Sequence, residues 1–249
     1  MNAPTDMLLA FDRSSRRPGW ALFRGNLCLL EQTADVEPSR TPDWLAHMGQ
    51  AIEGAGVRLA EISRFVAGLG PGSFSGTRAS VAALQGLALP GRRPLLGVAS
   101  AAAAAFAVLR ARAEHGLTTP VAVVGDAHRE RLWCALYALR DGHLAVLASG
   151  VARPPTHASG DFVLATWEHL PAALPADAWI ITPDHERIGE RLCAAVGTGR
   201  LAGASCLPSA ADVGRLFRAE PGAACFDPLP IYLHPAVAQR PPMTPNGQT

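Results

Sequence analysis

The chain contains no lysine, since all 22 of its basic residues are arginines. A Walker-type phosphate lysine, a lysine that forms a Schiff base and a lysine general base are therefore excluded. Charged residues make up 17% of the chain, below the roughly 25% usual in soluble domains, and the mean hydropathy is +0.14. We therefore expect some apolar surface to face a partner. The formal net charge of +1 argues against binding nucleic acid through bulk charge.

Cysteine is also scarce, and its spacing excludes two further classes of protein. The five cysteines are an odd number and form no C-x-x-C pair, which argues against a disulfide scaffold and a zinc knuckle. The N-terminus lacks the basic stretch of a signal peptide, and the longest apolar run, 99–109, is shorter than the roughly 18 residues of a membrane span. We expect a soluble protein of the reducing cytoplasm.

The residue patterns of common catalytic sites are missing as well. No two of the eight histidines are three or four positions apart, so no helical metal pair is expected. The chain has no G-x-S-x-G motif, and no cysteine has a sequence context that would activate a thiolate. We therefore predict no catalytic residue and no metal site.

What the sequence does contain is a repeated pattern of short strands. An apolar run at 8–11 ends in Asp12, and two further apolar runs follow with a turn between them. The same order returns about 113 residues later, with Asp126 in place of Asp12 and Asp141-Gly142 as the hairpin turn. Each copy then changes to helical periodicity. This predicts an α/β protein of two similar lobes, although two unrelated α/β segments can align this loosely.

A glycine-rich loop, 70–78, lies between a predicted strand at 65–69 and a predicted helix at 78–89. Free backbone N–H groups at a helix start favour anions, but a tight turn that joins strand to helix explains the loop equally well. Asp12, at its strand end, could hold Mg²⁺ or a phosphate-bound water. For Asp126 and the charged residues after it, a loop salt bridge is the simpler interpretation. The candidate residues for a nucleotide or anion are Asp12, Gly70, Gly72, Ser73, Gly76, Thr77 and Arg78.

Two helices of the first lobe are candidates for a partner surface. A helix is predicted over 42–53, because Thr41-Pro42-Asp43 has the residues of a helix start. Along the 78–89 helix, small residues follow one stripe, which would let another helix approach closely. Packing within the lobe and contact with another subunit explain this stripe equally well. The candidate partner residues are Trp44, Met48, Ser80, Ala83, Gly86 and Leu87.

Taken in order, several of these segments resemble the bacterial TsaB (YeaZ) family. The resemblance covers nearly the whole chain to about His234. The glycine loop is its most characteristic part. The matching segments are 12–15, the glycine loop with its helix to 88, 96–100, 126–137, 207–212 and 230–233.

The resemblance implies a two-lobed fold of the actin/Hsp70/sugar-kinase type. One lobe would span 1–114, a second 115–240 with a C-terminal part that packs back on the first, and 241–249 would be a disordered tail. The implied role is in making N6-threonylcarbamoyladenosine beside the anticodon of tRNAs. Proteins of this family lack the metal-binding histidines of the larger transferase paralogue, TsaD, and act as the platform that binds it and the small ATPase TsaE.

The resemblance leaves several points open. No cofactor is required, but weak binding of ATP or ADP with Mg²⁺ stays open, as does a homodimer. The family usually has a histidine before the first helix, where this chain has Ser39-Arg40-Thr41-Pro42, and an arginine at the position of His234. Contact with tRNA is expected only through the complex. The alternative function is an ATP-dependent kinase or ATPase of the same superfold, which fold alone does not exclude.

Overall fold

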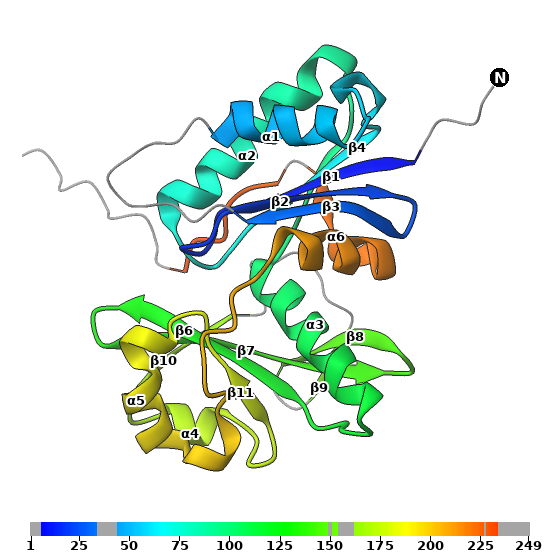
Figure 1. The fold of residues 1–249 in the computed structure, drawn as a ribbon. Helices are drawn as coiled ribbons and strands as arrows, with labels where there is room; N and C mark the ends of the chain where they lie inside the picture. Colours follow the sequence, from blue (N-terminus) through cyan, green and yellow to red (C-terminus); the bar gives the residue numbers. More distant parts are fainter. Residues whose placement is uncertain (1–5, 34–43, 149–150, 154–161, 227, 234–249) are drawn as a thin grey trace, which may run out of the picture.

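The computed structural model describes residues 6–33, 44–148, 151–153, 162–226 and 228–233 of the chain. Two lobes lie one above the other, each built on a β-sheet (Figure 1). Helices α3 (Ser100–Glu114) and α6 (Ala210–Ala219) lie between the two sheets. In the part of the chain that the structure describes, no helix combines the length and the apolar character needed to cross a membrane.

The sheet of the first lobe has the strand order β12-β5-β4-β1-β2-β3. Its first three strands form an antiparallel meander, and β4 and β5 continue the sheet parallel to β1. The bounds are β1 (Met7–Asp12), β2 (Gly19–Arg24), β3 (Leu27–Thr33), β4 (Arg64–Gly68), β5 (Leu95–Val98) and β12 (Cys225–Phe226). All residues of β1 are buried, because α1 (Trp44–Gly54) and α2 (Phe74–Ala88) cover one face of the sheet and α6 covers the other.

The sheet of the second lobe repeats this arrangement. Its order is β11-β6-β7-β8-β9, and β11 is parallel to β6 while β7 and β8 alternate in direction, as β4, β1, β2 and β3 do. The duplication predicted from the sequence is therefore confirmed. The turn at Asp141-Gly142 is confirmed too, since both residues have positive φ. The bounds are β6 (Val121–His128), β7 (Arg131–Arg140), β8 (His143–Ala148), β9 (Val151–Arg153), β10 (Val163–Thr166), which pairs with β7, and β11 (Trp179–Ile181).

The remaining helices cover the outer face of the second sheet or connect strands. Buried residues of α4 and α5 share a core with one face of β6 and β11. Between the sheets, five consecutive alanines of α3, 101–105, are buried, and such small side chains let the helix pack closely. The bounds are α4 (Leu170–Ala173), α5 (His185–Val196), η1 (Leu59–Glu61), η2 (Leu89–Gly91), η3 (Thr198–Arg200) and η4 (Pro221–Ala223).

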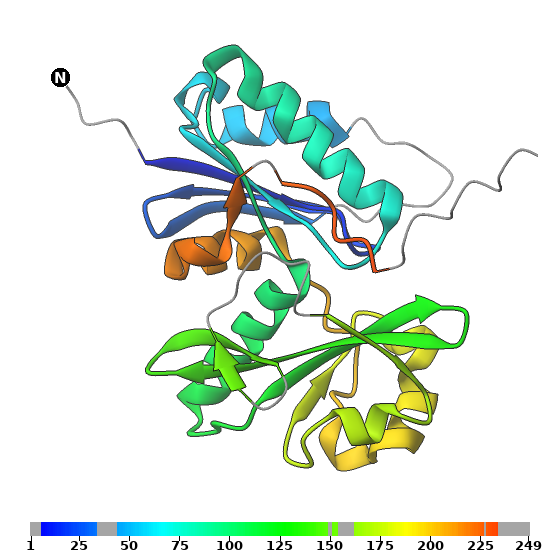
Figure 2. The same cartoon turned by 180° about the vertical axis from the view of Figure 1, so that it is seen from behind.

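After α6, the chain returns to the first lobe. Strand β12 pairs with β5, and the backbone N–H of Ile231 donates a hydrogen bond to the carbonyl of Leu69 at 2.9 Å. Figure 2 shows this last described segment, in orange and red, running along the first lobe to the start of α2. His234 and the predicted tail at 241–249 lie outside the described residues.

Helix α2 begins four residues earlier than the sequence predicted. Ser73 is its N-cap, and the Ser73 side chain accepts a hydrogen bond from the backbone N–H of Gly76 at 3.2 Å. Gly76, Thr77 and Arg78 therefore belong to the helix rather than to the loop before it. Helix α1, the first helix, is described from Trp44 onward. Its predicted start at Thr41-Pro42-Asp43 lies outside the described residues.

Candidate functional site

A cleft of about 1030 Å³ opens between the two lobes. Its upper wall comes from the β1–β2 loop, the start of α2 and the C-terminal segment, and its lower wall from the ends of β6 and β11 and the start of α5. The two walls carry opposite charge. The charged lining residues are Arg16 and Arg78 above, and Asp126, His128, Asp184, Glu186 and Arg187 below.

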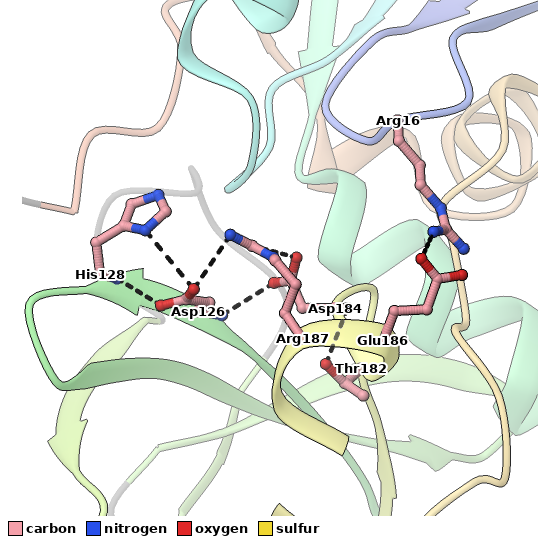
Figure 3. A network of polar contacts seen from close by, with 7 residues as sticks. All are labelled: Arg16, Asp126, His128, Thr182, Asp184, Glu186 and Arg187. Atoms are coloured by element: carbon pink, nitrogen blue, oxygen red, sulfur yellow. Dashed lines mark hydrogen bonds and ion pairs between the residues drawn. The ribbon is translucent and has the colours of Figure 1, made fainter. Parts of the chain in front are cut away.

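Two acidic groups of the lower wall, Asp126 and Asp184, are held by one arginine, Arg187 (Figure 3). The guanidinium of Arg187 lies 3.2 Å from Asp126 Oδ2 and donates a hydrogen bond to Asp184 Oδ1 at 2.6 Å. The backbone N–H of Asp126 also donates to Asp184 Oδ2 at 2.9 Å. The pKa of Arg187 is raised, chiefly by its hydrogen bond to Asp184. The Arg187 side chain thus links Asp184, at the start of α5, to Asp126, which holds the position in the second lobe that Asp12 holds in the first.

The loop contact expected for Asp126 is present, since His128 Nδ1 lies 3.6 Å from Asp126 Oδ2 and the His128 backbone N–H donates to Asp126 Oδ1 at 2.7 Å. Arg187 of α5 is a second partner, which the sequence did not predict. Sequence reasoning missed Asp184 and Arg187 altogether. Their signal is a Thr-Pro-Asp segment between an apolar strand and an amphipathic helix, a usual place for a ligand in α/β proteins.

One ion pair crosses the cleft, between Arg16 of the upper wall and Glu186 of the lower wall (Figure 3). Both side chains are half exposed or more, at 50% and 65%. Water screens a pair of this kind, so we assign it little stabilising energy.

Asp12 does not reach the cleft, which corrects its expected role as a ligand of Mg²⁺ or phosphate. The residue is 1% exposed and is absent from the cleft lining. Its Oδ1 accepts hydrogen bonds from the backbone N–H of Ser14 at 2.7 Å and the Ser14 hydroxyl at 2.6 Å, and its Oδ2 accepts one from the Ser100 hydroxyl. Burial raises the pKa of Asp12, and the hydrogen bonds from Ser100 and Ser14 oppose that shift. The carboxylate therefore ties β1 to α3 inside the first lobe.

The glycine loop is only partly directed at the cleft. Gly72, Ser73 and Arg78 line it, whereas Gly70, Gly76 and Thr77 do not. A Cβ atom on Gly76 would lie 2.1 Å from the carbonyl oxygen of Arg13. Since backbone cannot yield easily there, Gly76 lets the start of α2 press against the β1–β2 loop. The geometry favours the structural interpretation of the loop over an anion site.

The residues present do not fit a Mg²⁺-bound nucleotide. Asp12 is enclosed, and Asp126 and Asp184 are already engaged by Arg187. In the described ranges, His, Cys, Asp and Glu side chains form no group of three placed to hold a metal ion.

Two of the predicted partner residues belong to the core of the first lobe. Met48 and Ser80 are buried, and the Ser80 hydroxyl donates to the carbonyl of Gly76 at 3.3 Å. They are therefore corrected from surface to packing residues. Trp44, Ala83 and Leu87 are half-buried and pack against the core of this lobe. Gly86 is exposed, and a Cβ atom there would meet open space.

The repeated sheet order and the cleft between the lobes define a two-lobed α/β protein of the actin/Hsp70/sugar-kinase type. Residues 44–154 match the family model of TsaD, tRNA N6-adenosine threonylcarbamoyltransferase. The structure is similar to YeaZ from Pseudomonas aeruginosa, with a TM-score of 0.68 and 25% identity over 92% of this chain and 100% of that one. A Pseudomonas aeruginosa protein described as similar to peptidase YeaZ gives a TM-score of 0.69 with the same identity and coverage. No curated protein sequence gave a match. The chain is therefore similar to YeaZ over nearly its whole length, and part of it matches the TsaD family model.

Proposed function

We propose that this protein is the non-catalytic assembly and activating subunit of a cytoplasmic complex that makes N6-threonylcarbamoyladenosine in tRNA. The observation that carries the proposal is the likeness to YeaZ, which extends over the full length of that chain. The match of 44–154 to the family of the transferase supports a place in the same pathway. The proposed partners are a TsaD-like transferase and a TsaE-like ATPase.

The alternative, an ATP-dependent kinase or ATPase, is less well supported by the cleft. Such an enzyme needs an accessible carboxylate for the metal ion that accompanies the nucleotide. In the described part of the cleft, the two aspartates closest to the strand ends are occupied by Arg187, and Asp12 is sealed behind Ser14 and Ser100.

The exposed side of α1 and α2 is the proposed partner surface. Gly49 in α1 and Gly86 in α2 lie within their helices, and a Cβ atom on either would meet nothing within 4 Å. Glycine inside a helix costs about 1 kcal/mol relative to alanine. Because no packing within the described chain requires glycine there, we attribute it to the close approach of a second protein.

The test is a Gly86→Arg variant mixed with the TsaD-like transferase from the same organism. Arginine is a good helix former, so the melting temperature should be unchanged or higher. The bulky charge should abolish co-elution on size exclusion and the formation of N6-threonylcarbamoyladenosine in the reconstituted system. Gln85→Arg is the matched control, since Gln85 is an exposed neighbour that points about 100° away around the helix. Co-elution of Gly86→Arg at the level of the unaltered protein would contradict the assignment.

A further inference from the structure

Two segments that are far apart in the sequence meet at the mouth of the cleft. Arg78, in the first turn of α2, donates a hydrogen bond through Nε to the hydroxyl of Tyr232 at 2.9 Å. The guanidinium carbon of Arg78 lies 3.8 Å from the ring centroid of Phe74 and 5.5 Å from that of Tyr232. The two rings are themselves 5.5 Å apart. We call these three residues the arginine–aromatic cluster.

The cluster is exposed and positively charged. Phe74 is 56% exposed and Tyr232 50% exposed, and Arg78 is exposed as well. No carboxylate of the described residues lies within ion-pair distance of Arg78, whereas Arg16 and Arg187 of the same cleft each have an acidic partner. The ring stacking and the bond to Tyr232 fix the guanidinium plane and leave its two terminal nitrogens available.

A purely internal role does not account for this cluster. Such a role would be to hold the C-terminal segment on the first lobe. That segment, however, is already held by the pairing of β12 with β5 and by the bond from Ile231 to Leu69. Two half-exposed aromatic rings beside an arginine are the composition of a protein-binding surface.

We propose that the arginine–aromatic cluster docks an acidic and apolar segment of a protein partner. A carboxylate of that segment accepts hydrogen bonds from the terminal nitrogens of Arg78, and an adjacent apolar side chain covers the rings of Phe74 and Tyr232. The inference rests on the proposed function, because the partner is the transferase that approaches α2. Arg78 and Gly86 are both exposed on this helix and lie about 12 Å apart along its axis, so one partner can contact both.

The experiment measures the Kd of the full-length chain for the TsaD-like transferase at several salt concentrations. Arg78→Gln should raise Kd at least about tenfold, as truncation of a central interface arginine does. It should also flatten the dependence of Kd on salt, since a charge pair is lost. Arg78→Lys keeps the charge but not the planar guanidinium, so its Kd should lie between those of the unaltered protein and Arg78→Gln. Tyr232→Phe should give a smaller loss, because the ring remains.

Arg110→Gln is the matched control. Arg110 lies four residues after Phe106, with its guanidinium 5.9 Å from the ring, so it repeats the helical spacing away from the cleft. A salt dependence that is the same in Arg78→Gln as in the unaltered protein would overturn the inference, whatever the melting temperature. If Gly86→Arg abolishes binding while Arg78→Gln binds normally, the docking surface is wrong and the proposed function stands. If the unaltered protein does not bind the transferase, both are wrong.

Discussion

Asp12 and Asp126 occupy corresponding positions of the two lobes but have different surroundings. Asp12 is enclosed by two serine hydroxyls, whereas the Asp126 side chain is 20% exposed and faces Arg187. The repeat in the sequence predicted that the two carboxyl groups correspond. It could not predict their environments, because Ser100 and Arg187 come from distant helices that only the fold brings near.

The enclosed carboxyl group of Asp12 gives a prediction for pH dependence. Burial raises the pKa of Asp12 above its ordinary value of 3.8 in the folded state. At a pH between 3.8 and the raised pKa, the folded state therefore keeps a proton that the unfolded state has lost. The stability that this proton contributes is present at low pH and is lost as pH rises through the raised pKa. In Asp12→Asn, Oδ1 still accepts from Ser14 and the amide can donate to Ser100, but nothing titrates.

We therefore expect the unaltered protein to lose stability relative to Asp12→Asn as the pH rises above about 4, the ordinary pKa of an aspartate, until the carboxyl group of the folded protein has titrated. The free energy of unfolding of both proteins, measured by urea denaturation across this range, tests it. The two profiles would run parallel if the Asp12 carboxyl group were exposed to water. Ser15→Ala is the control and should follow the unaltered protein, because Ser15 lies in the same loop but its hydroxyl donates to the carbonyl of Arg17 and not to Asp12.

At the scale of elements, the sequence predicted most strands and the helices α1 and α2 but misplaced the start of α2. The sequence pattern places Gly76 in the loop, because glycine lowers helix propensity. Its place in the helix depends on the carbonyl of Arg13 in another segment, against which only glycine fits. Boundaries set by such long-range contacts cannot be read from local residue patterns.

Two glycines of α2 should respond in opposite directions to the same substitution. Gly76→Ala places a methyl group against the Arg13 carbonyl and should lower the free energy of unfolding by about 1–3 kcal/mol, despite the gain in helix propensity. Gly86→Ala meets open space and should raise it by up to about 1 kcal/mol. Guanidinium denaturation of the two variants measures both changes. Equal stability of Gly76→Ala and Gly86→Ala would show that α2 does not press on the β1–β2 loop.

At the scale of the whole molecule, the two lobes share one core. Buried residues of β1, α3, α6 and β6 belong to the same cluster. Helix α6 is also bonded to both lobes. Arg218 pairs with Asp6 beside β1, and Glu220 accepts a hydrogen bond from the backbone N–H of Leu144 in β8 at 3.1 Å. The duplicated pattern predicted two lobes from the sequence, but not which residues of α6 would join them, since those contacts span the length of the chain.

The shared core predicts that the lobes unfold together. A side chain on Gly214 of α6 would place Cβ 2.2 Å from the ring of Phe23, which is buried and cannot move aside. Gly214→Val should therefore lower the melting temperature, and hydrogen exchange should show β1 and β6 losing protection at the same denaturant concentration. Gly203→Val is the control for an added side chain. Gly203 lies in the segment before α6, and a Cβ atom there meets open space. If β1 lost protection while β6 kept it, α6 would belong to the first lobe alone, and the two copies of the repeat would fold as separate units.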